Sequence, residues 1–214
     1  MLIDLKLEGK TALIFGGGIV GERRARRFLQ EKSEIIVISK EFTRGLEQLG
    51  KQGKVKLIKS DIKSDPSFIS SLISNSNVVI VATDDQKLNE SIAKEAKKQK
   101  ILVSVADKPS ISDFYLPSIA RFGEIRIAIC TGGRSPAMSR ILRERLEKMI
   151  TREDILQVEL QHYARKLAKS SISDRKARRR ILYQIIQDPK INHLLKEGNL
   201  EEAKNLARQI IERQ

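Results

Sequence analysis

Short apolar runs alternate with amphipathic segments over the first half of the chain. The runs are rich in isoleucine and valine and have no regular polar positions, which is typical of strands buried on both faces of a parallel sheet. The predicted strands cover residues 12–15, 35–39, 55–58, 78–82 and 101–105. One predicted helix follows the glycines of 16–21, and three others cover 43–51, 66–74 and 86–100. This repeated β-α-β order with short links predicts an α/β fold with a doubly wound parallel sheet.

The pattern changes after residue 112. Residues 113–117 indicate a turn into a strand, and the two-residue alternation of 123–130 predicts a strand with one covered face. A loop at 131–135 then begins a helix, with Ser135 as N-cap and Pro136 as the first helical residue. The apolar face of this helix is expected to consist of Met138, Ile141, Leu142, Leu146 and Met149. Residues 113–146 therefore predict a small α+β segment.

The tail from residue 151 onward contains no predicted strand. Its helices are expected at 152–169, 174–187, 189–197 and 200–212, and the longest basic run, 175–180, lies on one of them. The expected helix caps are Thr151, Ser173, Asp188 and Asn199. Asn199 and Glu202 have the spacing of a capping box, and Gly198 is expected to end a helix. We therefore expect three domains, 1–112, 113–146 and a helical 147–214.

Three glycines join the first predicted strand to the first helix. Gly16, Gly18 and Gly21 have the spacing of the dinucleotide-binding fingerprint. The first makes the turn, the second lets the backbone approach a pyrophosphate, and the third lets helix and strand pack closely. The helix N-terminus offers N–H groups and its positive dipole end to the phosphates. Glycines also gather in plain turns, but the flanking strand and helix favour a Rossmann-like nucleotide site.

The net charge of +14 predicts attraction to polyanions. Nucleic acid, an anionic membrane surface and a small molecule with many carboxylates or phosphates all fit this charge. Aromatic residues make up 4% of the chain and tryptophan is absent, so platforms for stacking single-stranded bases are few. The surface chemistry of a heat-adapted protein would also account for many of the charges.

The cysteine and histidine content is low. Cys130 is the single cysteine, which excludes an internal disulfide framework and agrees with a reducing cytoplasm. With His162 and His193 as the two histidines, a structural zinc site is not expected. The N-terminus does not resemble a secretory signal, and no apolar run approaches the roughly 20 residues that span a bilayer. We therefore expect a cytoplasmic protein without a membrane segment.

The residues after the second strand bear on the choice of cofactor. Ligands of doubly wound sheets lie beyond the carboxyl ends of the strands. Ser39, Lys40 and Glu41 occupy this place here. An acidic residue near this point holds the ribose hydroxyls of NAD, whereas Lys40 would meet the 2′-phosphate of NADP. These residues by themselves leave the choice between the two cofactors open.

A polar cluster follows the fourth strand. It consists of Thr83, Asp84 and Asp85, with Asn89 a turn later. These residue types favour helix caps. Their place at a strand end also suits contact with the ribose or nicotinamide half of a dinucleotide, and we expect both roles.

Two further stretches offer chemistry. Asp107 follows the fifth strand, where a carboxylate could take a proton while hydride leaves, or could ligate an incoming metal. A turn-forming aspartate explains this position equally well.

In the later loop, backbone N–H groups at a helix N-terminus and a guanidinium suggest an anion site, although an ordinary capped helix start is an alternative. The residues of this loop are Gly132, Gly133, Arg134 and Ser135.

Four stretches taken together resemble one family. They are GGGIVGERRARRF, VATDDQKLN, VSVADKPSISDFYLPSI and ICTGGRSPAMSRILRERLE, in this order. They resemble precorrin-2 dehydrogenase, the NAD-dependent enzyme of sirohydrochlorin and siroheme synthesis in porphyrin metabolism. The resemblance covers residues 1 to about 150, and the helical tail is compatible with it. In some members the protein is also a sirohydrochlorin ferrochelatase, a lyase, or the N-terminal part of a siroheme synthase.

The resemblance implies a reaction and a set of residues. Precorrin-2, a tetrapyrrole with many carboxylates, is oxidised to sirohydrochlorin and hydride passes to NAD⁺, with insertion of Fe²⁺ left open. Asp107 matches the aspartate that serves dehydrogenation, and Ser135 matches a substrate-pocket serine that is phosphorylated in some relatives. Family members are intertwined homodimers, with the interface at 112–146 here. The implied cofactor contacts are Gly18, Ile19, Val20, Lys40 and Glu41.

Two departures and two rival functions accompany this assignment. Val-Ala-Asp replaces the commoner Val-Val-Asp of the family, and the methyltransferase half of the fused enzymes is absent, so methylation of uroporphyrinogen is not expected.

The rival from another class is an NAD-sensing regulator that binds nucleic acid through the basic run at 175–180. The absence of a clear helix-turn-helix pattern disfavours it, so no nucleic-acid partner is expected. A chelatase that has lost dehydrogenation is a third candidate, which the intact glycine pattern disfavours.

Overall fold

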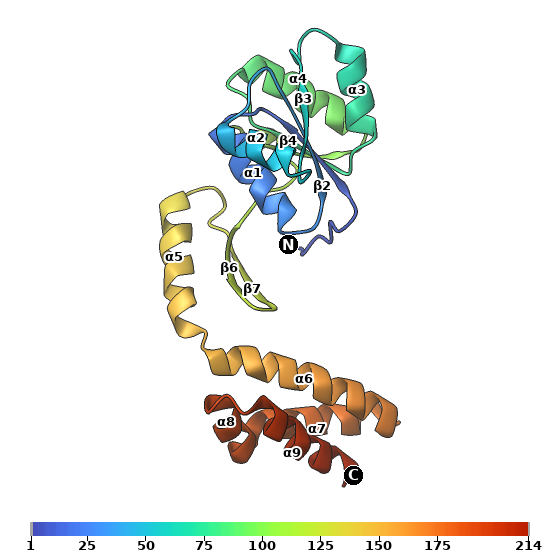
Figure 1. Ribbon diagram of the computed structural model, residues 1–214, viewed down its shortest axis with the longest axis vertical. Coiled ribbons are helices and arrows are strands. Elements are labelled where there is room, and N and C mark those ends of the chain that lie inside the picture. Colours follow the sequence, from blue (N-terminus) through green and yellow to red (C-terminus); the bar gives the residue numbers. More distant parts are fainter. Residues whose placement is uncertain (1, 214) are drawn as a thin grey trace. The chain divides into compact units, whose positions relative to one another are not determined.

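A five-stranded parallel sheet forms the centre of the N-terminal part of this protein, in a computed structural model that describes residues 2–213 (Figure 1). The strand order is β3-β2-β1-β4-β5, with every neighbouring pair parallel. The predicted doubly wound sheet is confirmed, and its switch point lies between β1 and β4. The strands are β1 (Thr11–Phe15), β2 (Glu34–Ser39), β3 (Lys56–Lys59), β4 (Val78–Val81) and β5 (Leu102–Val105).

Helices cover both faces of the sheet. Leu13 and Phe15 pack on one face with residues of α3 and α4, whereas Ala12 and Ile14 pack on the other with residues of α1 and α2. Because consecutive residues of a strand point to opposite faces, both faces of β1 must be apolar, and this explains the unbroken run in the sequence. The helices are α1 (Ile19–Leu29), α2 (Arg44–Lys51), α3 (Pro66–Ser74), α4 (Gln86–Lys98) and the short η1 (Pro109–Ile111).

The predicted bounds of α4 were two residues too long. The helix ends at Lys98 because Gln99 is its C-cap and Lys100 has a φ of +60°, which is outside the helical region. Thr43, predicted as the first residue of its helix, is instead the N-cap of α2 and accepts from the Leu46 N–H. Asp85, for which a cap role was predicted, accepts from the first turn of α4.

The outer edge of β5 is closed by side chains. The Val103 N–H donates to Asp113 Oδ2 at 3.0 Å, and the Val105 N–H donates to Ser112 Oγ at 2.9 Å. The Asp113 N–H returns a hydrogen bond to the Val103 carbonyl at 2.8 Å. These contacts satisfy backbone groups that an edge strand otherwise leaves unpaired.

The chain divides into two compact units, Met1–Leu116 and Pro117–Gln214. The division falls after the predicted boundary at 112 because Phe114 and Leu116 pack against the α1–α2 face of the sheet. The second unit begins with a hairpin of β6 (Ser118–Phe122) and β7 (Ile125–Ile129), followed by α5 (Pro136–Met149).

The hairpin and α5 bury little of their apolar surface. Within residues 117–150, all of which the structure describes, only Ala120 and Ser139 are buried. The predicted apolar face of α5 is instead largely open, with Met138 and Ile141 each 41% exposed and Met149 68% exposed. A two-stranded hairpin is marginally stable without further packing, so this segment lacks a core of its own.

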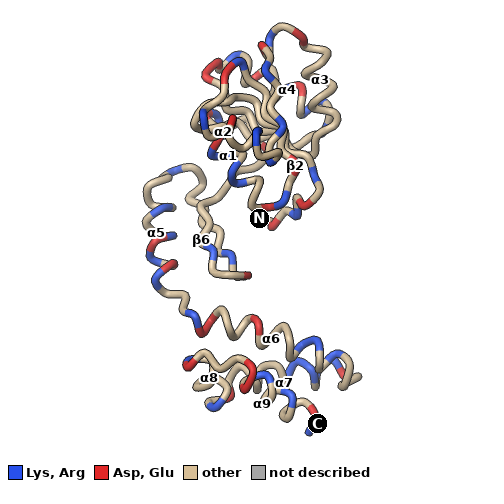
Figure 2. The backbone as a smooth tube through the Cα atoms, viewed as in Figure 1, with Lys and Arg blue, Asp and Glu red and all other residues tan. Residues whose placement is uncertain are grey.

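Four helices complete the second unit and confirm the helical tail. They enclose a separate apolar cluster that includes Leu160, Ile181, Ile191 and Ile211. The basic run at 175–180 lies on α7, as predicted (Figure 2). The helices are α6 (Arg152–Ser171), α7 (Arg175–Gln187), α8 (Pro189–Lys196) and α9 (Leu200–Glu212).

Two of the four expected caps in the tail were wrong or incomplete. Thr151 and Asp188 cap α6 and α8, but the cap of α7 is Asp174 rather than Ser173, because the Asp174 carboxylate accepts from two backbone N–H groups. Asn199 stands at the start of α9 without a side-chain cap, so the capping box with Glu202 does not form. Its amide faces Glu197 instead.

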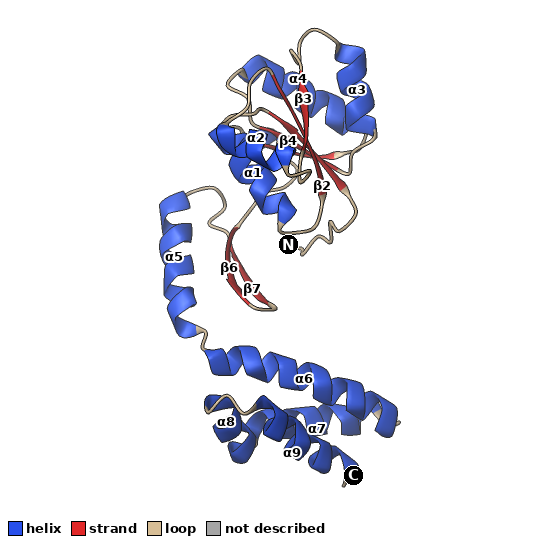
Figure 3. Cartoon of the chain, viewed as in Figure 1, coloured by secondary structure: helices blue, strands red, loops and turns tan. Residues whose placement is uncertain are grey.

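Figure 3 shows the helices of the tail without an accompanying strand among the residues described. Gly198, with a φ of +85°, ends α8 as expected. None of the helices described has both the length and the apolar character needed to cross a membrane.

Candidate nucleotide and substrate sites

Gly16 and Gly21 hold β1 and α1 together at the switch point. Gly16 has a φ of +111°, and its N–H donates to the Ile38 carbonyl at 3.0 Å. A Cβ on Gly16 would overlap the Ala82 carbonyl and lie 2.7 Å from its carbon. A Cβ on Gly21 would overlap the Gly16 carbonyl oxygen. Both roles predicted for these glycines, the turn and the close packing, are therefore present.

Gly18 leaves open space at the N-terminus of α1. A Cβ there would have no atom within 4 Å, and no side chain caps the helix at this residue. By contrast, α2, α3 and α4 each begin with a side-chain cap. Ile19 and Val20 form the first turn and are 81% and 37% exposed. The uncapped helix end and the free volume fit the pyrophosphate of a dinucleotide.

Gly17 has a structural role that the glycine spacing did not indicate. A Cβ on it would overlap the Glu41 carbonyl oxygen and lie 2.8 Å from the Phe42 ring. The Thr43 N–H donates to the Gly17 carbonyl at 3.0 Å. The glycine turn therefore rests on the loop after β2. The signal in the sequence was the uninterrupted run of three glycines, of which the fingerprint explains two.

Thr43 and Glu22 fix α1 against α2. The Thr43 Oγ1 donates to Glu22 Oε2 at 2.6 Å, and Arg26 Nε donates to Glu22 Oε1 at 2.8 Å. The hydrogen bond from Thr43, followed by that from Arg26, lowers the pKa of Glu22. Sequence reasoning missed this pair because its members are 21 residues apart.

The residues after β2 are accessible. Lys40 Nζ lies 2.9 Å from Asp61 Oδ2, in the loop after β3. The hydrogen bond from Lys40 is the main cause that lowers the pKa of Asp61. Glu41 is exposed beside it, and Ser39 is half-buried. The positive charge that would attract a 2′-phosphate is therefore already matched by a carboxylate.

Thr83, Asn89 and Asp107 come together at the carboxyl ends of β4 and β5. Thr83 Oγ1 donates to Asn89 Oδ1 at 2.5 Å. Asn89 Nδ2 donates to the Thr83 carbonyl at 3.0 Å and to Asp107 Oδ1 at 3.4 Å. Asp107 is exposed, whereas Asn89 is 1% exposed and contacts its protein neighbours rather than solvent. Three residues predicted from two separate stretches, one after β4 and one after β5, thus form one hydrogen-bonded group.

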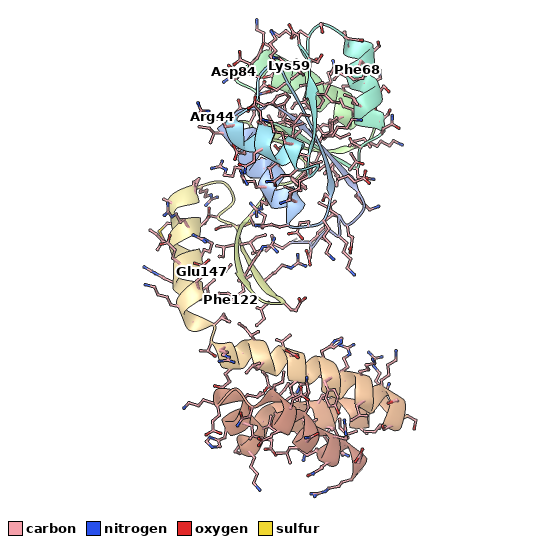
Figure 4. The ribbon with its side chains drawn as sticks, viewed as in Figure 1. Arg44, Lys59, Phe68, Asp84, Phe122 and Glu147 are labelled. Carbon is pink, nitrogen blue, oxygen red and sulfur yellow. The ribbon has the colours of Figure 1, made fainter. Side chains whose placement is uncertain are left out.

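The aspartates before α4 differ in role. Asp85 caps the helix by accepting from the Leu88 N–H at 3.0 Å, so the cap interpretation holds for this residue. It also pairs with Lys63 at 2.5 Å, which lowers the pKa of Asp85 and raises that of Lys63. Asp84, labelled in Figure 4, is exposed and remains a predicted cofactor contact.

The loop before α5 is tightly hydrogen-bonded. Thr131 Oγ1 donates to the Ser135 carbonyl at 3.1 Å, and Ser135 Oγ accepts from the Met138 N–H at 3.2 Å, which confirms Ser135 as the N-cap. Gly132 and Gly133 have φ angles of +61° and +76° and are exposed, as is Arg134. The loop can present the Arg134 guanidinium to an anion, whereas the Arg134 and Ser135 N–H groups donate to Thr131 within the loop. Among the residues described, no three His, Cys, Asp or Glu side chains form a group that could hold a metal.

Comparisons with known proteins agree with this geometry. The family described as putative NAD(P)-binding matches residues 3–118. A precorrin-2 dehydrogenase of Methanosarcina barkeri is 34% identical over 184 residues, which cover 86% of this chain and 81% of that protein. A siroheme synthase of Nitrosococcus oceani is 36% identical over 148 residues, which cover 69% of this chain but 30% of that longer protein.

A solved structure shares the fold. The precorrin-2 dehydrogenase SirC superimposes with a TM-score of 0.77 over 98% of this chain and 99% of that one, at 22% sequence identity. The likeness therefore extends through the middle segment and the helical tail. Together with the sequence identity to the Methanosarcina barkeri protein, these findings show that the chain belongs to the NAD(P)-binding precorrin-2 dehydrogenase family.

Proposed function

We propose that this protein oxidises precorrin-2 to sirohydrochlorin with NAD⁺ in siroheme biosynthesis. The observation that carries the proposal is the pairing of an open, uncapped glycine turn at β1 with an exposed carboxylate, Asp107, at the same edge of the sheet. The Methanosarcina barkeri relative, which covers 86% of this chain, carries the name of this activity. The relatives named above lend no support to the nucleic-acid-binding regulator.

The glycine turn and the neighbouring strand ends would hold the cofactor. Backbone N–H groups at Gly18, Ile19 and Val20 would receive the pyrophosphate, because α1 begins without a side-chain cap. The loop after β2 would receive the adenosine ribose, and Thr83 with Asp84 the nicotinamide half. When bound, NAD⁺ supplies the hydride acceptor.

Asp107 would manage the proton. Precorrin-2 loses two electrons and two hydrogens on becoming sirohydrochlorin: one hydrogen leaves as hydride and the other as a proton. Asp107 is exposed at the end of β5, so its carboxylate can reach a bound macrocycle and accept that proton.

The carboxylates of the substrate would meet positive groups. Gly132, Gly133 and Arg134 are exposed, and the net charge of the chain is +14. Such a field attracts a polyanionic macrocycle and raises its association rate.

We also propose that the protein is a homodimer in the cytoplasm. The support for a dimer is the apolar surface that β6, β7 and α5 leave open, including Met138, Ile141 and Met149. A second copy would cover this surface and supply the core that the segment lacks. The single cysteine, Cys130, agrees with a reducing compartment.

Anaerobic incubation with precorrin-2 and NAD⁺ tests the proposed reaction. The expected result is the sirohydrochlorin spectrum together with one equivalent of NADH for each macrocycle oxidised. Omission of NAD⁺ is the control, and NADP⁺ in its place measures cofactor preference. A parallel sample with Fe²⁺ and purified sirohydrochlorin tests metal insertion separately. Precorrin-2 that stays unchanged with NAD⁺ and NADP⁺ would refute the dehydrogenase assignment.

A further inference from the structure

We propose that Asn89 is a positioning residue that orients the carboxylate of Asp107. The proposal rests on the proposed dehydrogenase function, in which Asp107 accepts a proton. It assigns to Asn89 a role through another side chain rather than a direct contact with the cofactor. The inference follows from the burial of Asn89 and from the direction of its three side-chain hydrogen bonds.

The orientation of the Asn89 amide is determined by its neighbours. Its Nδ2 faces two acceptors, the Thr83 carbonyl at 3.0 Å and Asp107 Oδ1 at 3.4 Å. If the amide were rotated by half a turn, its oxygen would face both acceptors and neither contact would be a hydrogen bond. The Thr83 hydroxyl, which can donate, faces the amide oxygen at 2.5 Å. The amide is therefore a directed link from Thr83 to Asp107.

The link connects a buried side chain, Asn89, to an exposed one, Asp107. Asn89 is 1% exposed, and its own N–H donates to the Asp85 carbonyl at 2.9 Å in the first turn of α4. Asp107 lies on a bend after β5 and is exposed. A carboxylate in that setting samples several rotamers unless a neighbour selects one. The hydrogen bond from Asn89 selects the rotamer in which Oδ1 faces α4.

Asparagine suits this position better than its closest substitutes. Aspartate would place a second carboxylate against Asp107 and against the Thr83 carbonyl, where a donor is needed. Leucine has a similar size but would leave the Thr83 hydroxyl and carbonyl without their partner. The distance of 3.4 Å to Asp107 is long for a hydrogen bond, so its effect is on orientation more than on stability.

The first test compares Asn89→Leu with wild type and with Asn75→Leu, a matched change at the exposed C-cap of α3. We expect Asn89→Leu to lower kcat by about tenfold to a hundredfold, the loss that a misplaced catalytic group causes. The KM for precorrin-2 is expected to stay within about twofold of wild type, and the Kd for NAD⁺, which also depends on Thr83, is expected to rise by much less than kcat falls. Asn75→Leu is expected to retain the wild-type kcat. Thermal unfolding monitors the fold of each variant.

A second measurement does not depend on turnover. In the free protein, the side-chain amide protons of Asn89 report their acceptors through their ¹⁵N-correlated resonances and exchange rates. Asp107→Ala removes one acceptor, so we expect one of the two amide protons to shift and to exchange faster. The proton bonded to the Thr83 carbonyl is expected to keep its resonance.

The outcomes separate this inference from the proposed function. If wild type does not oxidise precorrin-2, the proposed function fails, and with it the role of Asn89 in that reaction. If wild type is active and Asn89→Leu keeps its kcat, or loses NAD⁺ affinity in proportion to kcat, the positioning role is refuted. If Asn89→Leu unfolds, Asn89→Ser replaces it, and unchanged Asn89 amide resonances in Asp107→Ala refute the contact itself.

Discussion

The α-carbon of Gly21 faces the carbonyl oxygen of Gly16 so closely that no methyl group fits between them. This contact joins the first turn of α1 to the end of β1. Gly18 lies between the two glycines in sequence but has open space around it. The same short turn therefore contains one glycine that packing requires and one that leaves room for a ligand.

Gly21→Ala is expected to destabilise the protein, whereas Gly18→Ala is expected to affect binding. The added methyl at Gly21 would push α1 from β1 and lower the free energy of unfolding by about 1–3 kcal/mol, as overpacked cores do. The methyl at Gly18 would leave stability nearly unchanged and weaken NAD⁺ binding. Urea unfolding and NAD⁺ titration of both variants check this pair, and equal stability losses would contradict it.

Asp107→Ala and Asp107→Asn are expected to abolish turnover without preventing cofactor binding. Removal of a proton acceptor costs about a hundredfold or more in rate. Because Asp107 is exposed, neither change is expected to lower the unfolding temperature. Stopped-flow measurement of NADH formation, with NAD⁺ affinity measured in parallel, checks the prediction. Turnover at the wild-type rate in Asp107→Asn would remove the catalytic role of this residue.

Asp61→Asn is expected to shift the cofactor preference toward NADP⁺. The change frees the ammonium of Lys40, which now lies 2.9 Å from Asp61, for a 2′-phosphate. We expect the ratio of NADP⁺ to NAD⁺ affinity to rise by about threefold to tenfold, a modest change because the pair is exposed to solvent. Asp65→Asn, which alters the cap of α3, is the control. An unchanged affinity ratio in Asp61→Asn would show that Lys40 does not contact the 2′-phosphate of NADP⁺.

Glu22 is expected to contribute acid sensitivity to the fold. Its pKa in the folded chain is lowered by Thr43 and Arg26 from an ordinary value of 4.5, so its contribution is complete above that pH and is lost as the pH falls through the folded value. Glu22→Gln is therefore expected to be less stable than wild type near neutrality and closer to it in acid. Unfolding midpoints at several pH values check this, with Glu212→Gln as control. A constant difference across pH would contradict it.

Ile141→Glu is expected to convert the proposed dimer into a monomer. The side chain is 41% exposed on α5, in the segment that lacks its own core. Ile186→Glu is a matched control, since Ile186 is 39% exposed on α7 in the helical tail. Light scattering after size-exclusion chromatography measures the mass of each variant. A monomeric wild type would refute the dimer, and a dimeric Ile141→Glu would move the interface elsewhere.

The sheet was predictable from sequence because both faces of its central strands, β1 and β4, are buried. Residues such as Ile14 and Ile80 lie opposite one another in the centre of the sheet, and the runs that contain them are apolar without interruption. The glycine turn was predictable too, because the spacing of its glycines is a local pattern in the sequence. The helix caps of the tail were less predictable. Ser173 and Asp174 are adjacent, and both residue types cap helices.

The contacts of the site required the fold. Asn89 was predicted from its place after a strand, but its link to Asp107 joins residues 18 positions apart that only the neighbouring strands β4 and β5 bring together. The support of Gly17 by Phe42 is of the same kind. Sequence pattern indicates which residues lie at the strand ends, and the order of the strands determines which of them meet.

The closure of β5 by Ser112 and Asp113 has a consequence for how the protein behaves in crowded solution. A naked outer strand is a template on which a neighbouring molecule can add its own backbone and start an aggregate. Here the chain occupies that template with its own hydroxyl and carboxylate, so the sheet cannot grow on this side. The carboxyl end of the same strand, where Asp107 is exposed, stays accessible while the outer flank of the strand is closed.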